Sequence, residues 1–231
     1  IFSGIGLEHN LYLYGETPAE PLSDMNGAGI YWQAAWWFRL YWGAIAIILM
    51  VAAHLLWRRG TETRLKPRLK RAPARLRGSP GLIAGAALAV GIATGSWIFY
   101  NTNVLNEYRT EDEGEVFAAE YERRFLRFEN LPQPAITHVV LEVDLHPEQI
   151  RADVRDRYVL RNLTDRPIRD VHVRRTDVYQ QLQAIDFPGA RLASHDQEYD
   201  YRIYRLDRAM APGETRELAF RVRREQVGFR N

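Results

Sequence analysis

The six histidines are the side chains of this sequence best suited to acid–base or metal chemistry, and their spacing decides whether they can act together. They are His9, His54, His138, His146, His172 and His195. None of them begins an H-E-x-x-H sequence, in which two histidines one helical turn apart bind zinc beside a general base. The sequence has no cysteine, which excludes zinc–thiolate sites, disulfides and thiol chemistry.

Three of these histidines lie in the part of the sequence that has strand periodicity. His138, His146 and His172 fall at positions that alternation turns away from the apolar side of a strand. We therefore interpret each of them as an exposed side chain and assign none of them a chemical role.

A run of acidic residues is the next candidate for chemistry, because carboxylates bind calcium. The run consists of Glu111, Asp112, Glu113 and Glu115. It lacks the alternating ligand spacing of a calcium loop. We interpret it as the solvated first turn of a helix, where carboxylates are stabilised by the positive end of the helix dipole.

Other chemical motifs do not occur in the sequence. It has no G-x-S-x-G, no P-loop and no G-x-G-x-x-G. The triplet Asn162-Leu163-Thr164 fits a glycosylation sequence, but such triplets arise by chance and this one falls in a predicted turn. We therefore predict that residues 1–231 contain no catalytic, cofactor-binding or metal-binding residue.

Two apolar stretches must position everything else. Residues 81–100 carry no charged side chain, and a helix of this length matches the hydrocarbon core of a bilayer, about 30 Å thick. Residues 36–57 are apolar except for Arg39 and His54 near their ends, and Arg39 lies among aromatic residues typical of the headgroup level. The sequence predicts a two-helix transmembrane hairpin, so the lipid bilayer is the expected partner. The alternative is a helix buried in a soluble core, but such helices are usually shorter and keep a polar stripe.

Small residues recur within the second apolar stretch. Gly81 and Gly85 have the small-xxx-small spacing, as do Gly91 and Gly95. This spacing allows close packing against a neighbouring helix, and simple exposure to lipid is an equally good interpretation.

Residues 58–80 between the two stretches determine the orientation. They contain nine lysines and arginines and one acidic residue, Glu62, which a net charge of +2 for the whole chain conceals. Residues 1–35 contain no lysine or arginine. The positive-inside rule predicts a cytoplasmic loop at 58–80 and places residues 1–35 and everything after residue 100 outside. Binding of the loop to anionic lipid fits this topology, whereas the lack of interleaved aromatic residues argues against nucleic acid.

The periodicity changes twice after the second stretch. Within a linker at 101–134, residues 113–129 have apolar side chains at helical spacing, which predicts an amphipathic helix. From residue 136 the period becomes two, which predicts strands. The predicted strands are residues 136–145, 150–160, 168–173, 182–187, 199–206 and 216–223. We expect an α+β membrane protein in which residues 135–231 form an antiparallel all-β sandwich or saddle, incomplete because the last strand continues into residues 227–231.

Several segments resemble a known family. They are WIFYNTNVLNEY, AAEYERRF, LPQPAITHVVLEVDLHPE, YVLRNLTDRPIRDVHV and APGETRELAFRVRREQVGFRN. Together they resemble bacterial inner-membrane proteins in which an ABC-type transporter permease is fused to an aminopeptidase N-like zinc metallopeptidase. By this resemblance the WFRLYWGA segment belongs to the last permease hairpin, and residues 135–231 are the amino-terminal β domain of the peptidase, in the periplasm.

The resemblance implies partners and a cofactor outside this sequence. Zinc and the catalytic residues belong to a domain that follows Asn231, so no position here inherits a catalytic role. Upstream permease helices, the downstream catalytic domain and an ATP-binding transporter subunit are the implied partners. Two alternatives stay open: an accessory periplasmic module that binds a substrate or partner for a permease, and a structural module on a membrane tether.

Overall fold

The computed structural model describes residues 7–25, 27–57, 65–175 and 179–231. The chain divides into two compact units. The hairpin unit consists of Ile1–Glu115 and Val227–Asn231, and the β unit consists of Val116–Gln226. The α+β class and the antiparallel strands expected from the sequence are confirmed.

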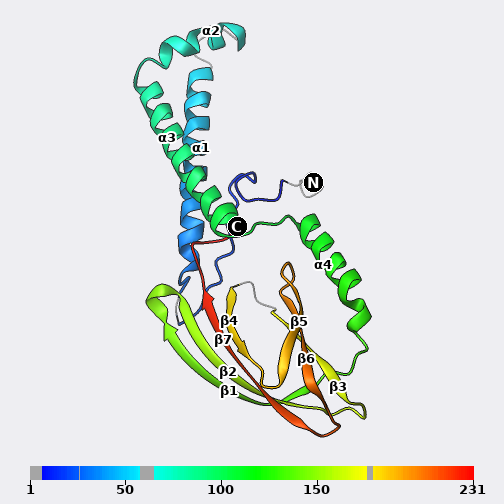
Figure 1. Ribbon diagram of the computed structural model, residues 1–231. Helices are drawn as coiled ribbons and strands as arrows, with labels where there is room; N and C mark the ends of the chain where they lie inside the picture. The colour runs from blue at the N-terminus through cyan, green and yellow to red at the C-terminus, as the bar shows by residue number, and fades with distance from the viewer. Residues whose placement is uncertain (1–6, 26, 58–64, 176–178) are drawn as a thin grey trace. The chain divides into compact units, whose positions relative to one another are not determined.

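The hairpin unit is built on two long apolar helices that run side by side, α1 (Tyr31–Leu56) and α3 (Ser79–Phe99) (Figure 1). Small residues line their contact, since a Cβ on Gly91 would lie 3.7 Å from that of Ala44 and one on Gly95 would lie 3.1 Å from the Tyr41 ring. A Cβ on Gly85 would meet nothing within 4 Å. Of the two glycine pairs, Gly91 and Gly95 therefore serve helix packing. Most other side chains of both helices point outward.

Helix α1 starts at Tyr31 after Ile30, and no side chain of the described residues caps its first turn.

The basic connection, predicted as a loop, contains the helix α2 (Leu65–Arg75). Lysine, arginine, leucine and alanine are good helix formers. Pro67 is tolerated in the first turn, where backbone N–H groups have no intrahelical partner, while Pro73 removes one bond farther along. The Arg75 guanidinium donates to the Leu55 carbonyl at 3.3 Å and so caps the end of α1.

A π-helical segment, η2 (Tyr100–Leu105), continues α3. Wider helical turns leave carbonyls of α3 short of donors, and side chains of the next turn supply them. Asn101 Nδ2 donates to the Trp97 carbonyl at 2.8 Å, and Thr102 Oγ1 donates to the Ile98 carbonyl at 2.9 Å. Both Asn101 and Thr102 are buried.

Residues 227–231 pack beside this segment. Asn106 Nδ2 donates to the Val227 carbonyl at 2.9 Å, and Phe229 is buried against Phe38. Gly228 has a φ of 59°, and a Cβ there would lie 2.3 Å from Asn101 Oδ1, so this position requires glycine. The expectation that the last strand continues through residues 227–231 is therefore wrong.

The β unit contains seven strands in two antiparallel sheets. They are β1 (Ala135–His146), β2 (Arg151–Arg161), β3 (Ile168–Arg174), β4 (Gln180–Asp186), β5 (Ala190–Asp196), β6 (Tyr201–Met210) and β7 (Thr215–Glu225). One sheet has the order β1-β2-β7-β4 and the other β3-β6-β5 (Figure 1). The pattern predicted all of them except β5, whose side chains are mostly exposed and therefore lack an apolar period.

A core between the two sheets holds them together. Leu160 of β2, Leu218 of β7 and Leu206 of β6 are among its buried members. Asn162 closes one end of it, because Nδ2 donates to the carbonyls of Arg166 and Met210 at 2.7 and 2.9 Å. The asparagine of the glycosylation-like triplet is therefore fully buried and has a structural role.

Leu206→Ala is expected to lower the free energy of unfolding of the β unit by about 2–5 kcal/mol, because Leu206 is 0% exposed and its loss leaves a cavity. Leu192→Ala, at a neighbouring position of β5 that is 51% exposed, is the control and should change it by less than about 0.5 kcal/mol. Hydrogen exchange of the β6 amides in the full chain measures both values. Equal effects would contradict this assignment of the core.

Candidate binding site

A hollow of the β unit lies over the inner face of the four-stranded sheet. Its volume is about 630 Å³, within the range of about 300–1,000 Å³ that ligand pockets occupy. One wall comes from inward positions of β1, β2, β7 and β4, and β3 contributes to the rest of the lining. We call this hollow the inner cavity.

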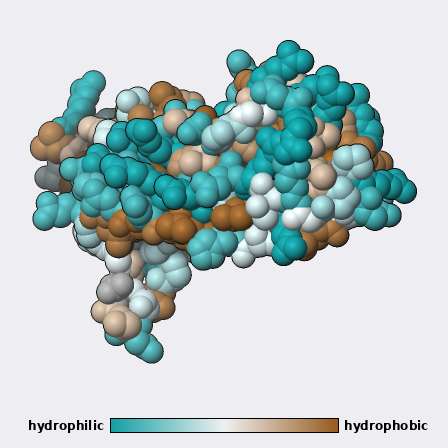
Figure 2. Space-filling view, turned by 60° about the horizontal axis from the view of Figure 1, so that its bottom comes forward, coloured by the Kyte–Doolittle hydropathy of each residue, from teal (hydrophilic) through white to brown (hydrophobic). Residues whose placement is uncertain are grey.

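Strand alternation makes the inner cavity apolar. On β1 the inward residues include Leu141 and Val143, and on β2 they include Val154 and Tyr158. The second sheet leaves the β1 side uncovered, so Leu141 and Val143 remain 55% and 51% exposed. Figure 2 shows hydrophobic side chains gathered in a band between hydrophilic ones on one face of the molecule. The expectation of one apolar face per strand is confirmed, but on β1 that face is open.

Asp156 interrupts the apolar lining at its centre. It stands on β2 opposite Leu141 of β1 and Phe220 of β7. The side chain is half-buried, and its Oδ1 atom is buried without a hydrogen-bond partner among the described residues. Burial raises the pKa of the Asp156 carboxyl, because an apolar environment disfavours its charged form.

Asp156 also borders a smaller hollow of about 340 Å³, which is lined by Glu142 and Arg155 on the opposite face of the sheet. Alternation along β2 assigns its side chain to the inner cavity, together with Val154 and Tyr158. Burial and the Asp156 charge both raise the pKa of the Tyr158 hydroxyl, in agreement with this placement.

The basic residues that line the inner cavity have other partners. The Arg174 guanidinium lies over the Tyr121 ring, 4.1 Å from its centre, and Arg175 Nε is 3.0 Å from Asp200 Oδ2. The Arg224 guanidinium lies 5.5 Å from the centre of the Tyr179 ring. The described residues therefore give Asp156 no ion pair within 4 Å.

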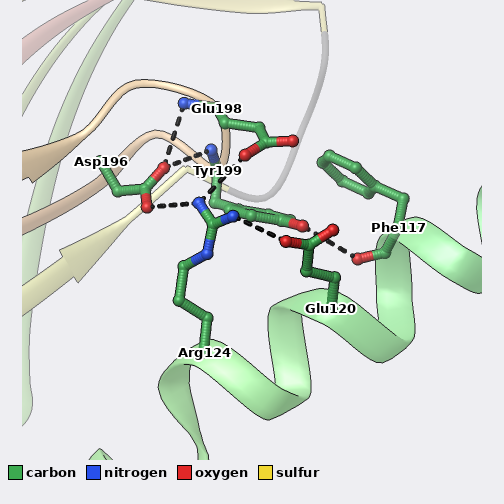
Figure 3. Close-up of polar contacts among 6 residues, drawn as sticks. All are labelled: Phe117, Glu120, Arg124, Asp196, Glu198 and Tyr199. Atoms are coloured by element: carbon green, nitrogen blue, oxygen red, sulfur yellow. Dashed lines mark hydrogen bonds and ion pairs between the residues drawn. The ribbon is translucent and has the colours of Figure 1, made fainter.

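A second polar cluster fixes the helix α4 (Glu111–Phe125), whose residues from Val116 onward belong to the β unit. Arg124 contacts carboxylates of Glu120 at 2.9 Å, Asp196 at 2.8 Å and Glu198 at 3.0 Å (Figure 3). The hydrogen bond from Arg124 lowers the pKa of Asp196. Asp196 and Glu198 accept bonds from this cation, so they hold α4 in place.

Aromatic rings reinforce this attachment. Phe117 stacks on Tyr199 at 4.5 Å between ring centres, and Phe125 stacks on Tyr201 at 4.2 Å. The Tyr199 hydroxyl donates to the Phe117 carbonyl at 3.3 Å (Figure 3). The predicted amphipathic helix is confirmed, although α4 ends at Phe125 and a 3₁₀ turn, η3 (Leu126–Phe128), follows it.

The acidic run occupies the first turn of α4, as interpreted from the sequence. Glu111, Asp112 and Glu113 lie in that turn. Thr110 and Glu113 bond each other's backbone, since Glu113 Oε2 accepts from Thr110 N at 2.9 Å and Thr110 Oγ1 accepts from Glu113 N at 3.3 Å. This reciprocal pair is a capping box.

One histidine of the β unit, His172, is among the residues that line the inner cavity. His138 is exposed as predicted, but His172 is half-buried, and its Nδ1 lies 2.7 Å from the Tyr201 hydroxyl. The prediction of an exposed side chain is therefore wrong for His172, and also for His146, which is half-buried too. Burial lowers the pKa of His172. His9 is buried, lies 3.0 Å from Thr102 Oγ1, and has its pKa lowered to about 4 by burial. The described residues contain no group of three or more side chains arranged to hold a metal ion.

Sequence reasoning missed Asp156. Its inward neighbours on β2, Val154 and Tyr158, belong to an alternating apolar set in the sequence. A charged residue at an inward position of that set is the available indication. A lone carboxylate inside such a set is unusual because its burial is costly.

No known protein-family model matches this chain, and a search of curated proteins gave no match.

Arg124→Met is expected to increase hydrogen exchange in residues 116–125 at pH 7, because it removes the cation that joins α4 to β5 and the turn that follows it. Asp196 has a lowered folded-state pKa, so its stabilising contribution is present above the unfolded pKa and is lost as the pH falls through the folded value. The difference between variant and wild type should therefore shrink in acid. Arg123→Met, at an exposed neighbouring position, is the control, and an equal increase in that variant would exclude a specific role for Arg124.

Asp156→Asn is expected to raise the free energy of unfolding of the β unit by about 1 kcal/mol at pH 7, since an amide is cheaper to bury than an unpaired carboxylate. The raised folded-state pKa means that wild-type stability is lost as the pH rises through that value, so the difference should vanish at lower pH. Denaturant unfolding of the full chain at several pH values measures it. The control is Glu217→Gln on the outer face of β7, which should have little effect. A variant that is less stable than wild type at neutral pH would contradict this account of Asp156.

Proposed function

We propose that this chain anchors a β domain to a membrane, with α1 and α3 crossing the bilayer as a hairpin. The observation that carries the proposal is the outward surface of these helices. Both are long and apolar enough to cross a membrane, and in the most apolar part of each only 17% of the residues are buried. A helix in the core of a soluble protein would be mostly buried.

The charge distribution supports one orientation. The connection between the spans carries nine basic residues, whereas the segment before the first span carries none up to Arg39. Arg39 is ion-paired with Glu20 near the start of α1, which reduces the cost of placing it at the headgroup level. On this basis α2 lies on the cytoplasmic side and the β unit on the opposite side.

The form of α2 suits a position at the membrane surface. It is held at the end of the hairpin by the bond from Arg75 to Leu55, and Lys66 and Lys70 are exposed. Leu69 is also exposed, which supplies an apolar contact for the acyl boundary. Short basic amphipathic helices of this kind bind anionic headgroups.

A finer assignment rests on the sequence resemblance. We propose that the β unit is the amino-terminal β domain of an aminopeptidase N-like zinc metallopeptidase fused to an ABC transporter permease in a bacterial inner membrane. The position of the β unit directly after an apolar hairpin supports it. The gene sequence that follows Asn231 tests it: H-E-x-x-H with a downstream glutamate supports the peptidase, and further apolar spans support an accessory module of a transporter.

The topology predicts the outcome of reporter fusions in bacterial cells. A protein that fluoresces only in the cytoplasm should be bright when fused after Arg77 and dark when fused after Asn130, because basic residues resist translocation. Immunoblots of the fusions control for expression. Bright cells from the Asn130 fusion would contradict the orientation, and extraction of the chain from membranes by alkaline carbonate would contradict the spans.

A further inference from the structure

From the environment of Asp156 we infer that the inner cavity binds an organic monocation, an ammonium group carried on an apolar body. This function is additional to membrane anchoring and independent of it, because every residue that lines the cavity belongs to the β unit.

The first argument is the unpaired charge. The Asp156 carboxylate stands among inward-facing Leu141, Val154 and Phe220, and one of its oxygens is buried without a partner among the described residues. An ammonium group in the cavity would supply the opposite charge and a hydrogen-bond donor to the carboxylate. Hydrogen bonds between two charged groups are about twice as strong as neutral ones. A destabilising carboxylate in a cavity is also typical of functional positions.

Aromatic rings beside Asp156 favour the same ligand. Tyr158 and Phe220 lie edge to face with their ring centres 4.8 Å apart, and Phe220 stands directly opposite Asp156 in the sheet. The faces of such rings attract cations. The aliphatic side chains of the same wall suit the apolar body of the ligand, since they would be removed from water with it.

The basic groups on the facing walls limit the ligand to a single positive charge. His172 and Arg174 belong to β3, Arg175 follows it, and Arg224 belongs to β7. These arginines contact Tyr121, Asp200 and Tyr179, as described above, and would repel a polycation. An anion would be repelled by Asp156 at the centre.

The uncovered side of β1 gives the ligand a way in. Leu141 lies opposite Asp156 in the register and is 55% exposed. Asp156 is half-buried and is one of the residues that line the cavity. A ligand that enters past Leu141 reaches the carboxylate without any displacement of the second sheet.

Three probes of the same shape test the inference. They are 4-phenylbutylamine, 4-phenylbutan-1-ol and 4-phenylbutanoate, titrated by calorimetry into the full chain in maltoside micelles, with empty micelles subtracted. The amine should bind the wild type at least about 10-fold more tightly than the alcohol, as one charge-assisted hydrogen bond allows, and the butanoate should bind most weakly.

Variants locate the site. Asp156→Asn should weaken amine binding at least about 10-fold and leave alcohol binding unchanged, whereas Glu217→Gln should change neither. Leu141→Trp should weaken all three probes by filling the entrance. Amine binding should also weaken as the pH falls through the raised pKa of Asp156. Burial lowers the pKa of His172, so its competing positive charge forms at more acidic pH than that of an ordinary histidine.

Equal affinity of the wild type for amine and alcohol would overturn the inference, whatever the variants do. Undiminished amine binding by Asp156→Asn would overturn it too. Since neither measurement depends on a bilayer, failure of the membrane proposal leaves this result unaffected.

Discussion

The need to satisfy backbone hydrogen bonds where side chains are apolar governs the hairpin unit. Helices α1 and α3 present hydrocarbon outward, so their peptide groups must bond within each helix. This requirement becomes difficult where α3 widens into the η2 turn. Asn101 and Thr102 meet it by donating to carbonyls one turn back, and for that reason polar residues are buried beside an otherwise apolar helix.

In the β unit, hydrogen bonds between neighbouring strands satisfy the backbone groups. The unfavourable groups in this unit are side chains. Two sheets share a core around Leu206, but the four-stranded sheet is wider than the three-stranded sheet that faces it. The excess apolar face on β1 remains open, and a carboxylate stands where that face meets β2 and β7. An open apolar wall and an unpaired charge are both unfavourable alone, and together they are the two halves of a binding site for an amphiphilic cation.

Much of this fold can be predicted from one sequence, because its strongest patterns are long. The two apolar stretches, the amphipathic helix and six strands follow from periodicity. Helix α2 could not be predicted that way, since two prolines and many positive charges are typical of a loop, and β5 has too few buried residues to show a period. The placement of His172 and of residues 227–231 depends on contacts between distant parts of the chain, which no local pattern contains. Alternation along β2 indicates the inward side of Asp156, but its neighbours Leu141 and Phe220 follow only from the strand register.

The bond between Asn106 and Val227 has a mechanical consequence. These residues lie 121 positions apart in the chain, and the whole β unit lies between them. The two ends of this stretch of chain are joined within the hairpin unit, where Phe229 is buried and Gly228 fits against Asn101. These contacts would therefore carry tension applied at the two ends of the whole chain before the tension reached any sheet. The strands would bear load only after these contacts had broken, so the contacts protect the β unit from forces that act on the hairpin.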